Sequence, residues 1–430
     1  MLKQARSQGD IIAVLKERGL ISQITESGLP EAAARDQLYV YCGFDPTAPS
    51  LHVGNLVPVM ALAHFQRLGH RPILVVGGGT GMIGDPSGKS VERPLLSPEQ
   101  VVAYSARIRD QLAGYLSFEG PAAAIMVNNA DWLGTMSLIE YLRDVGKHFT
   151  VNVMLAKESV KARLGSESGI SYTEFSYMVL QATDYLHLFD AHGCTVQVGG
   201  NDQWGNLIAG VELIRRTREA HVHALTVPLI TAASGAKFGK SEGNALWLDS
   251  AMTTPYKMYQ YWINTADEDV GHFLKVFTFM SLGEIGELER QQAERPERRE
   301  AQRRLAFEVA RLIHGEAIAK AVAAASTVLF GGELEGLTPE VLPHLAAEVP
   351  TTAIATSALA AGLPLLDALV AAGAQPSKGA ARRLLQQGGV YVNDQRIADT
   401  ERALTLADAL FGRAILLRAG KNKYHLLLAE

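Results

Sequence analysis

The sequence predicts an α/β fold in which a Rossmann-like parallel-sheet domain is followed by an α-helical domain and a small α+β domain. Three observations support this prediction. Short apolar runs alternate with longer helical patterns up to about residue 250, strand-like runs are missing from about 253 to 330, and a pattern of helix then hairpin begins near residue 376. At 430 residues the chain is long enough for two or three domains, each with its own core.

The N-terminal domain begins with a helical pattern. Ile11, Ile12, Val14 and Leu15 recur at helical spacing, which predicts an amphipathic helix and not the apolar segment of a signal peptide. Because long helical patterns separate the apolar runs that follow, we expect those runs to form parallel βαβ units. They predict four strands, at residues 38–41, 73–76, 124–127 and 195–198.

The rest of the chain divides where the composition changes. Helical periodicity continues through 256–262 and 301–313, and glycine, proline and threonine become frequent from 331 to 362. Beyond them, Pro376-Ser377 indicates the start of a helix and Asn393-Asp394 the turn of a hairpin. We therefore expect a parallel-sheet domain at 1–252, a helical domain at 253–335, a linker at 336–362 and a small C-terminal domain at 363–430.

The composition excludes several classes of protein. Hydrophobic residues make up 47% and charged residues 20%, which is typical of globular domains and not of disordered chains. No apolar run approaches the roughly 18 residues that a membrane span needs, so we expect no membrane partner. Two cysteines, Cys42 and Cys194, cannot form a disulfide scaffold or a four-cysteine zinc site, and they suit a reducing cytoplasm. No metal-ligand cluster is visible, so no protein metal site is expected.

The formal charge is unevenly distributed along the chain. The whole chain carries −5, which gives no general reason to expect a nucleic-acid partner. Residues 376–430, however, hold nine lysines and arginines against five acidic residues, a net charge of +4, which leaves −9 for the remainder. The positive charge is therefore local to the C-terminal domain.

A glycine-rich segment follows the second predicted strand. Gly79, Gly81 and Gly84 match the G-x-G-x-x-G pattern of dinucleotide-binding proteins, so a nicotinamide-dependent oxidoreductase is one alternative. Residues 85–88 weaken it because they continue as a turn and open no helix, and the acidic residue expected about 20 positions later is missing. A P-loop is excluded because Ile83 stands where its first glycine is needed. The glycines still predict a close approach to the backbone at the carboxyl end of a parallel strand.

Two further segments suit phosphate chemistry. Residues 41–47 leave a strand and residues 50–55 enter a helix, which places His52 near a helix N-terminus, where anions are favoured. Far downstream, Lys237 and Lys240 stand three apart in a loop of small residues, beside a serine hydroxyl. Taken singly, the first segment is more often a structural helix start and the second a solvated basic loop. Their occurrence in one chain favours a shared site.

Together these segments resemble the two signatures of class I aminoacyl-tRNA synthetases. Residues 52–55 match the first signature, with Asn55 in place of its second histidine, and residues 237–241 match the second. The resemblance extends to the bacterial-type tyrosyl-tRNA synthetases and covers essentially the whole chain. Four segments occur in the order of that family: 41–47, 84–89, 199–206 and 237–241.

The predicted helix at 173–188 gives an independent indication of the substrate. Tyr177, Gln181 and Asp184 lie at i, i+4 and i+7 and therefore share one helical face. That face would ordinarily be an apolar core stripe, and the simpler alternative is a partly exposed helix. A carboxylate buried there needs a polar partner. The helix therefore predicts part of a binding site for a polar ligand.

The resemblance implies a tyrosine–tRNA ligase, which forms tyrosyl-adenylate and pyrophosphate from L-tyrosine and ATP and then transfers tyrosine to the 3′-terminal ribose of tRNA(Tyr). It implies that Tyr41 and Asp184 contact the phenol hydroxyl. The tyrosine-binding residues implied are Tyr41, Asp85, Tyr177, Gln181, Asp184 and Gln203. The ATP-binding residues implied are Asp45, Gly54, Asn55, Lys89, Arg93, Gly200, Asp202 and Lys240. The catalytic residues implied are Thr47, His52, Lys237, Lys240 and Ser241.

The resemblance also implies partners outside the tyrosine pocket. Mg²⁺ is expected to arrive with the ATP phosphates, and the protein is expected to be a homodimer. The helical domain is expected to contribute to anticodon recognition, and residues 363–417 resemble an RNA-binding domain shared with a ribosomal small-subunit protein. There, Lys378, Arg382 and Arg383 on one predicted helix can contact tRNA phosphates. A non-catalytic RNA-binding homologue is the remaining alternative, and the presence of both signatures argues against it.

Overall fold

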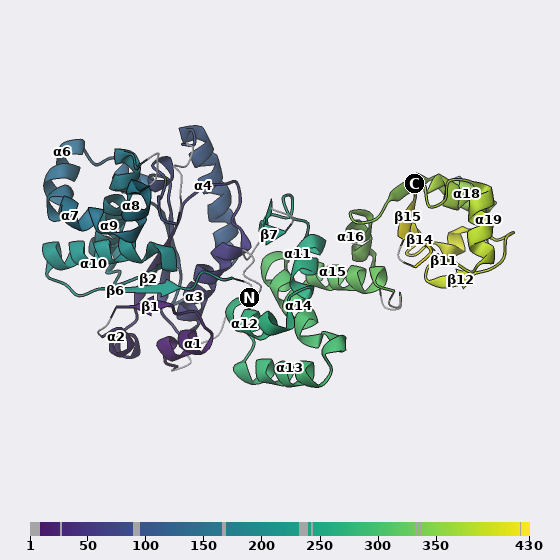
Figure 1. Ribbon diagram of the computed structural model, residues 1–430, viewed down its shortest axis with the longest axis horizontal. Coiled ribbons are helices and arrows are strands. Elements are labelled where there is room, and N and C mark those ends of the chain that lie inside the picture. The colour runs from purple at the N-terminus through teal and green to yellow at the C-terminus, as the bar shows by residue number, and fades with distance from the viewer. Residues whose placement is uncertain are drawn as a thin grey trace. The chain divides into compact units, whose positions relative to one another are not determined.

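The chain divides by its internal contacts into two compact units, residues 1–252 with 268–289 and residues 253–267 with 290–430. Figure 1 shows their helices and strands. The computed structural model describes residues 9–25, 28–88, 95–165, 169–231, 240–241, 244–331, 334, 337–421 and 423–430.

The first unit is built on a six-stranded sheet with the order β1-β6-β5-β2-β3-β4. Its strands are β1 (Gln23–Ile24), β2 (Tyr39–Phe44), β3 (Arg71–Val76), β4 (Ile125–Asn128), β5 (Val196–Gly200) and β6 (His223–Val227). Strands β2 to β6 are parallel, and β1 pairs with β6 in the antiparallel direction. The four predicted strands are confirmed as β2 to β5, whereas the sequence analysis did not identify β6.

The order of the strands locates the place where such a sheet binds ligands. From β2 the chain continues to β3 and β4 on one side, and it then returns to form β5 and β6 on the other side. The carboxyl ends of β2 and β5 therefore flank a point at which the strand order reverses, and open α/β sheets bind ligands at such points. Residues 45–47 follow β2, and the 3₁₀ helix η5 (Asn201–Gln203) follows β5.

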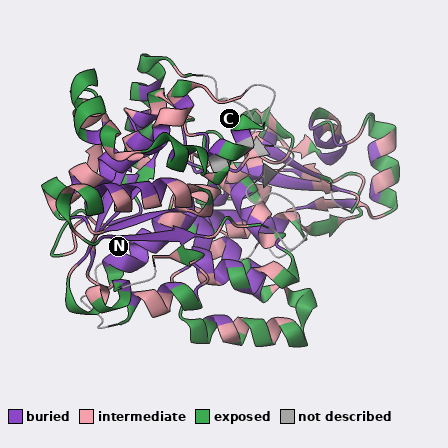
Figure 2. Cartoon of the chain, turned by 60° about the vertical axis from the view of Figure 1, so that its left-hand side comes forward, coloured by how far each residue is buried: buried purple, intermediate pink, exposed green. Residues whose placement is uncertain are grey.

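Helices pack on this sheet through buried faces. Helix α1 (Ile11–Glu17) confirms the first predicted helix, and the Asp10 side chain caps it by accepting hydrogen bonds from two backbone N–H groups. The central strands β2, β3, β5 and β6 are mostly buried, as is most of α3, and Figure 2 shows this buried layer. The longer helices are α2 (Leu29–Arg35), α3 (Leu56–Arg67), α4 (Pro98–Ala113), α9 (Tyr172–His192) and α10 (Trp204–Arg218). Among the described residues, no helix combines the length and the apolar character needed to cross a membrane.

Short helices connect β4 to α9. They are α5 (Ala130–Leu133), α6 (Leu138–Glu140), the π-helical turn η3 (Tyr141–Val145), α7 (Val151–Leu155) and α8 (Glu158–Leu164). A buried ion pair between Arg163 and Glu174 joins α8 to the first turn of α9, with a nitrogen-to-oxygen distance of 2.8 Å. This pair fixes the start of the helix that carries three of the predicted site residues.

The expected helical region consists of α11 (Pro255–Ile263), α12 (Asp267–Phe277), α13 (Leu282–Glu294), α14 (Glu300–His314) and α15 (Glu316–Leu329). Residue 252, however, does not mark a simple boundary, because residues 268–289 belong with the first unit. Arg18, at the end of α1, contributes to this arrangement by donating hydrogen bonds to the carbonyls of Lys275, Thr278 and Met280.

The C-terminal domain begins earlier than the sequence predicts. Residues 336–362 were expected to be a linker, but β9 (Thr351–Ile354) pairs in parallel with β15 (Lys423–Ala429), and Leu359 of α17 (Thr356–Ala361) lies in the domain core. The linker prediction is therefore wrong for this stretch. Glycine, proline and threonine were taken for a linker composition, whereas Thr351 and Thr352 are β-branched and suit the edge strand that they form.

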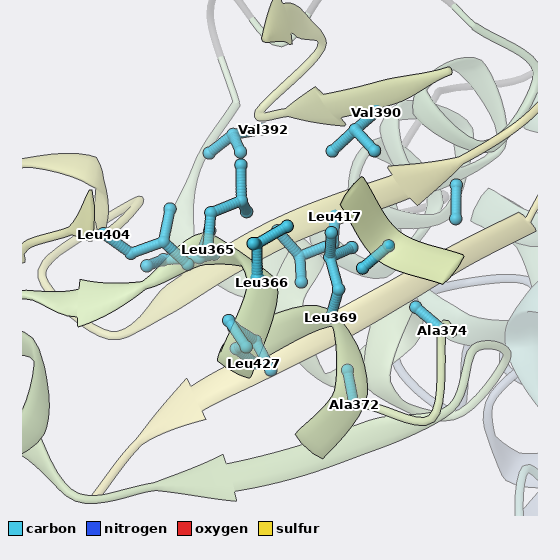
Figure 3. Close-up of a cluster of buried hydrophobic side chains, with 14 of the residues drawn as sticks. Leu365, Leu366, Leu369, Ala372, Ala374, Val390, Val392, Leu404, Leu417 and Leu427 are labelled. Atoms are coloured by element: carbon cyan, nitrogen blue, oxygen red, sulfur yellow. The ribbon is translucent and has the colours of Figure 1, made fainter. Parts of the chain in front are cut away.

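Most elements from α17 to β15 pack around one core of leucine, valine and alanine side chains, shown in Figure 3. The five-stranded sheet has the order β12-β11-β14-β15-β9. The predicted hairpin is confirmed, because Asn393 and Asp394 form its turn with positive φ angles of 47° and 62°. The other elements are η7 (Pro339–Val341), α16 (Leu342–Ala346), β10 (Leu363–Pro364), α18 (Leu365–Ala371), α19 (Lys378–Gln386), β11 (Val390–Val392), β12 (Gln395–Ile397), β13 (Ala403–Leu404) and β14 (Ala414–Ala419).

Candidate active site

A cavity of roughly 430 Å³ opens at the carboxyl ends of β2 and β5, at the reversal of the strand order. It brings together residues that are far apart in the sequence. The predicted site residues that line it are Tyr41, Asp45, Thr47, His52, Gly54, Asn55, Asp85, Tyr177, Gln181, Asp184, Gly200, Asp202 and Gln203.

The remaining predicted residues of this site are not placed in the cavity. Lys89, Arg93 and Lys237 lie outside the described residues. For Lys240 and Ser241 the structure describes the backbone, which forms β7 (Lys240–Ser241) and pairs with β8 (Asn244–Ala245).

One buried polar group of the cavity is the carboxylate of Asp184, a residue of α9 that is 4% exposed. Its Oδ1 accepts a hydrogen bond of 2.8 Å from the indole nitrogen of Trp132, and its Oδ2 accepts one of 2.9 Å from the Asn129 amide nitrogen. Burial raises the pKa of Asp184 to about 7, although both hydrogen bonds oppose the rise by favouring the charged form. Asp184 therefore changes charge close to neutral pH.

Tyr41, on β2, also lines this end of the cavity. Its side chain is 1% exposed, and its ring packs edge-on against Tyr185, with 5.2 Å between the ring centroids. In the described part of the chain its hydroxyl has no hydrogen-bond partner. Burial and the neighbouring carboxylate of Asp184 raise the pKa of this phenol well above its usual value, so the hydroxyl keeps its proton.

A second carboxylate, that of Asp45, receives two hydrogen bonds where the chain leaves β2. The Tyr177 hydroxyl donates to Oδ2 at 2.6 Å, and the Thr80 hydroxyl donates to Oδ1 at 2.7 Å. Burial, together with the carboxylates of Asp45 and Asp85, raises the pKa of Tyr177 well above its usual value. The Tyr177 hydroxyl therefore keeps its proton and acts as a hydrogen-bond donor to Asp45 within the cavity.

A third carboxylate, that of Asp85, lies in a polar cluster with three amide side chains. Gln203 donates to its Oδ2 at 2.6 Å, and the amide nitrogen of Asn206 lies 3.5 Å from its Oδ1. The same nitrogen of Asn206 lies 3.1 Å from Oε1 of Gln181 and 3.0 Å from Oε1 of Gln203. The cluster therefore places one carboxylate and two amide oxygens close together, a set of acceptors that suits a cationic donor.

The first signature forms a tight junction between a loop and a helix. The backbone N–H of Gly54 donates to Nδ1 of His52 at 3.0 Å, and Asn55 closes a capping box by accepting from the His52 N–H. Because Nδ1 accepts a hydrogen bond, the proton of the neutral ring is on Nε2. A Cβ at Gly54 would lie 2.8 Å from the His52 ring, so only glycine fits beside it.

The segment after the second signature returns to the first one. The backbone N–H of Val53 donates to the carbonyl of Leu246 at 3.0 Å, and that of Leu248 donates to the carbonyl of Leu51 at 2.8 Å. His52 also contacts the Trp247 ring edge-on, with 6.1 Å between the ring centroids. Backbone pairing therefore joins the first signature to residues 246–248, which follow the second signature in the sequence.

The glycine-rich segment does not form a dinucleotide-binding turn. Residues 80–82 form a short 3₁₀ helix, and among the described residues up to 88 no α-helix follows that could present its N-terminus to a pyrophosphate. The close approach that the glycines predict is to the protein itself. A Cβ at Gly77 would lie 2.0 Å from an oxygen of Asp45, and one at Gly78 would lie 2.3 Å from an oxygen of Asn128.

Three residues around the carboxylates escaped the sequence analysis: Thr80, Asn129 and Trp132. None belongs to a periodic pattern, because they lie in the glycine turn and in or beside the four-residue helix α5. One signal could have indicated Asn129, since it follows β4 directly and so lies at the carboxyl edge of a parallel sheet.

The predicted tRNA contacts lie in the second unit, on the confirmed helix α19. Lys378, Arg382 and Arg383 are all exposed. Lys378 also forms an ion pair with Asp367 of α18, so part of its charge is balanced within the domain.

Comparisons with known proteins show which family the chain resembles. Residues 33–331 match the family of class I tRNA synthetases for tryptophan and tyrosine, and residues 342–427 match the C-terminal domain of tyrosine–tRNA ligases. The chain is 51% identical over 419 residues to the tyrosine–tRNA ligase of Roseiflexus castenholzii, which covers 97% of this chain and 99% of that protein. It is 53% identical over 420 residues to the tyrosine–tRNA ligase of Mycobacterium tuberculosis, which covers 96% of this chain and 97% of that protein.

A solved structure of a tyrosyl-tRNA synthetase resembles three quarters of the chain. The C-terminally truncated mitochondrial tyrosyl-tRNA synthetase of Aspergillus nidulans superposes with a TM-score of 0.68 at 32% identity, covering 75% of this chain and 94% of that one. The chain thus belongs to the class I tRNA synthetases for tryptophan and tyrosine and, within them, to the tyrosine–tRNA ligases.

Proposed function

We propose that the cavity binds L-tyrosine with its phenol hydroxyl between Tyr41 and Asp184. The buried, unpartnered hydroxyl of Tyr41 is the observation that carries this assignment, because an unsatisfied buried hydroxyl is costly unless a ligand completes it. A phenol hydroxyl can donate to the ionised carboxylate of Asp184 and accept from Tyr41 at the same time. Phenylalanine has no hydroxyl and would leave both groups without that partner.

The ammonium group of the substrate is proposed to lie at the other polar cluster. Asp85, Gln181 and Gln203 supply the acceptors, and Tyr177 contributes its hydroxyl oxygen. An ammonium has three donors and no acceptor, so it fits a carboxylate surrounded by amide oxygens. Tyrosine would then have its phenol held by the carboxylate of Asp184 and its ammonium by that of Asp85.

Adenosine is proposed to lie over the first signature and the end of β5. Asp45, Asn55 and Asp202 would provide polar contacts, with Asp202 on the ribose. Gly54 and Gly200 are proposed to contact adenosine through their backbone. A Cβ at Gly200 would lie 2.6 Å from an Asp202 oxygen, so a larger residue there would displace that carboxylate.

In the first step the tyrosine carboxylate would attack the α-phosphorus of ATP. A bond forms between a carboxylate oxygen and phosphorus, and the bond to the bridging oxygen breaks as pyrophosphate leaves with Mg²⁺ as part of the substrate. The attacking carboxylate is already ionised, so no general base is needed. His52 would donate from Nε2, and Thr47 from its hydroxyl, to the charge that develops on the phosphates.

The second signature and the loop after the glycines would supply the remaining positive charge. Lys237, Lys240 and Ser241 are proposed to close on the β- and γ-phosphates, with Lys89 and Arg93 as further contacts. In the second step a ribose hydroxyl of tRNA(Tyr) would attack the carbonyl of tyrosyl-adenylate, and AMP would leave.

The exposed basic face of α19, with Lys378, Arg382 and Arg383, is proposed to contact tRNA phosphates. A cytoplasmic location is proposed from the two free, buried cysteines, Cys42 and Cys194.

We also propose a homodimer formed through an apolar surface on the short helices. Leu138, Ile139, Val151, Val153 and Tyr172 are exposed on α6, α7 and the start of α9. Exposed apolar side chains gathered in this way are typical of an interface between copies of a chain. The variant Ile139→Asp/Val151→Asp is expected to sediment as a monomer, whereas Val102→Asp, which changes an exposed valine of α4, is expected to remain dimeric. A dimeric double variant would contradict this surface assignment.

A matched pair of aspartates on α9 tests the tyrosine assignment. Asp184→Asn removes one of the two acceptor oxygens at the phenol end, whereas Asp190→Asn changes a surface residue that pairs with Arg218. Loss of a hydrogen bond to a charged group costs about 1.5–3 kcal/mol. We expect kcat/KM for tyrosine in ATP–pyrophosphate exchange to fall at least tenfold in the first variant and less than twofold in the second. Equal effects in both would refute the assignment.

A further inference from the structure

Thr80 lies at the centre of a buried chain of hydrogen bonds that joins two carboxylates of the cavity, those of Asp184 and Asp45. Its hydroxyl accepts a hydrogen bond of 2.9 Å from the Asn129 amide nitrogen and donates one of 2.7 Å to Oδ1 of Asp45. The same Asn129 nitrogen donates to Oδ2 of Asp184 at 2.9 Å. One threonine hydroxyl therefore links the carboxylate at the phenol end to the carboxylate beside Tyr177.

The direction of this chain is fixed by its donors and acceptors. The Asn129 oxygen accepts from the backbone N–H of Gly79 at 2.7 Å, which determines how the amide is turned. Its nitrogen then has two hydrogens, one for Asp184 and one for Thr80. Because Thr80 receives one of them, its own hydrogen must point to Asp45. Only a hydroxyl can accept on one side and donate on the other in this way.

The glycine turn is shaped to bring Thr80 into this position. A Cβ at Gly77 would lie 2.0 Å from Oδ1 of Asp45 and 2.6 Å from the Thr80 hydroxyl oxygen, so that any larger residue would push them apart. The backbone N–H of Thr80 also points to the Asn129 oxygen, at 3.4 Å. With 2% exposure for Thr80 and 1% for Asn129, water has little access to substitute for either group.

We propose that Thr80 is a positioning residue for both halves of the substrate site. Through Asn129 it holds Asp184 in place for the tyrosine phenol, and directly it holds Asp45 in place for adenosine and for the Tyr177 hydroxyl. The inference rests on the proposed roles of Asp184 and Asp45. The G-x-G-x-x-G pattern suggested that the glycine-rich segment binds a dinucleotide. The inference gives the segment a structural role instead, because Gly77 lies against the carboxylate of Asp45.

This role predicts an effect at both ends from the loss of one oxygen atom. Thr80→Val keeps the shape of the side chain but can neither accept from Asn129 nor donate to Asp45. We expect the Kd for tyrosine, measured by equilibrium dialysis, to rise about fivefold to tenfold. We expect the second-order rate constant for tyrosyl-adenylate formation with ATP, measured by stopped flow at saturating tyrosine, to fall roughly tenfold.

Two further variants separate positioning from general damage. Thr80→Ser keeps the hydroxyl and is expected to restore both constants to within about threefold of the parent. Thr183→Val makes the same change at another buried threonine, whose hydroxyl donates to the Val179 carbonyl of its own helix at 2.7 Å. This control is expected to change neither constant by more than twofold.

The outcomes distinguish the inference from the proposed function beneath it. If Thr80→Val alters only one constant or neither, or if Thr80→Ser is as impaired as Thr80→Val, Thr80 is not a positioning residue for both ends. If Asp184→Asn leaves the selectivity for tyrosine over phenylalanine unchanged, the proposed assignment of the phenol end is what fails. An effect of Thr80→Val on both constants, rescued by serine, supports the inference.

Discussion

Two buried tyrosines that touch each other provide the sharpest test of the site. Tyr41 and Tyr185 are both almost fully buried, and their rings pack edge-on. They differ in the hydrogen bonding of their hydroxyl groups. That of Tyr185 donates to the carbonyl of His223 at 2.8 Å, whereas that of Tyr41 has no partner in the described ranges. Changing each to phenylalanine removes one oxygen from nearly the same environment, but the two changes are expected to have opposite effects on stability.

The size of each effect follows from the state of the hydroxyl. An unsatisfied buried polar group costs about 1–3 kcal/mol, so Tyr41→Phe is expected to raise the free energy of unfolding by about 1 kcal/mol or more. Tyr185→Phe loses a satisfied hydrogen bond and is expected to lower it by about 0.5–1.5 kcal/mol. Since 1 kcal/mol shifts the melting temperature of a domain of 150–250 residues by about 2–4 °C, thermal unfolding resolves both changes.

Tyrosine should remove the advantage of Tyr41→Phe. A ligand stabilises the folded state in proportion to the logarithm of its concentration over Kd, so a tenfold weaker Kd forfeits about 1.4 kcal/mol at saturation. The variant that is more stable without tyrosine is therefore expected to be no more stable than the parent at saturating tyrosine. Its kcat/KM ratio for tyrosine over phenylalanine in ATP–pyrophosphate exchange should fall about tenfold, and that of Tyr185→Phe should not change. Destabilisation of the unliganded Tyr41→Phe variant, or unchanged selectivity, would refute the reasoning.

Three further predictions concern pH, the second signature and the C-terminal domain. Burial raises the pKa of Asp184 to about 7. Because protonation removes the charge of this carboxylate, the affinity for tyrosine measured by equilibrium dialysis should fall as the pH drops below 7. A Kd for tyrosine that is constant from pH 5.5 to 8.5 would contradict this prediction. Because this folded-state pKa lies above the value of about 3.8 expected when unfolded, the group's contribution to stability is present below pH 4 and is lost as the pH rises to 7. Lys240→Ala should lower the stopped-flow rate of adenylate formation by about 10²–10³ while changing the Kd for tyrosine less than twofold, and equal losses in both would exclude a role confined to ATP. Deletion of residues 342–430 should abolish tRNA charging but spare tyrosine-dependent ATP–pyrophosphate exchange, and charging by the truncated protein would disprove that division of labour.

Much of the fold could be predicted because its signals are local. Buried parallel strands appear as continuous apolar runs, and β2 to β5 were found in this way. The order of the strands was not predictable, because pairing depends on contacts between distant segments. The linker error has the same origin, since residues 351–354 become a strand only when they pair with residues 426–429, more than 70 positions later.

The site could be predicted where helical spacing or a signature indicated it. Tyr177, Gln181 and Asp184 share a helical face and line the cavity as expected. Thr80 and Asn129 could not be found in this way, because the bond between them joins residues 49 positions apart in two turns without periodicity. Residue patterns alone left two alternatives open, an oxidoreductase and a non-catalytic homologue. The family to which the chain belongs favours a tyrosine–tRNA ligase over both.

The charges of the cavity support the proposal that the second signature contributes lysines to the ATP step. Four carboxylates line the cavity, those of Asp45, Asp85, Asp184 and Asp202, and its described lining includes no lysine or arginine. Such a lining favours the ammonium of an amino acid but repels the phosphates of ATP. Binding both substrates side by side therefore requires cations that come from outside this lining. The Mg²⁺ that accompanies ATP can supply part of that charge, and the lysines of residues 237–241 can supply the rest. The acidic cavity and the basic signature are thus complementary, and the chemistry of the ATP step should depend far more strongly on those lysines than tyrosine binding does.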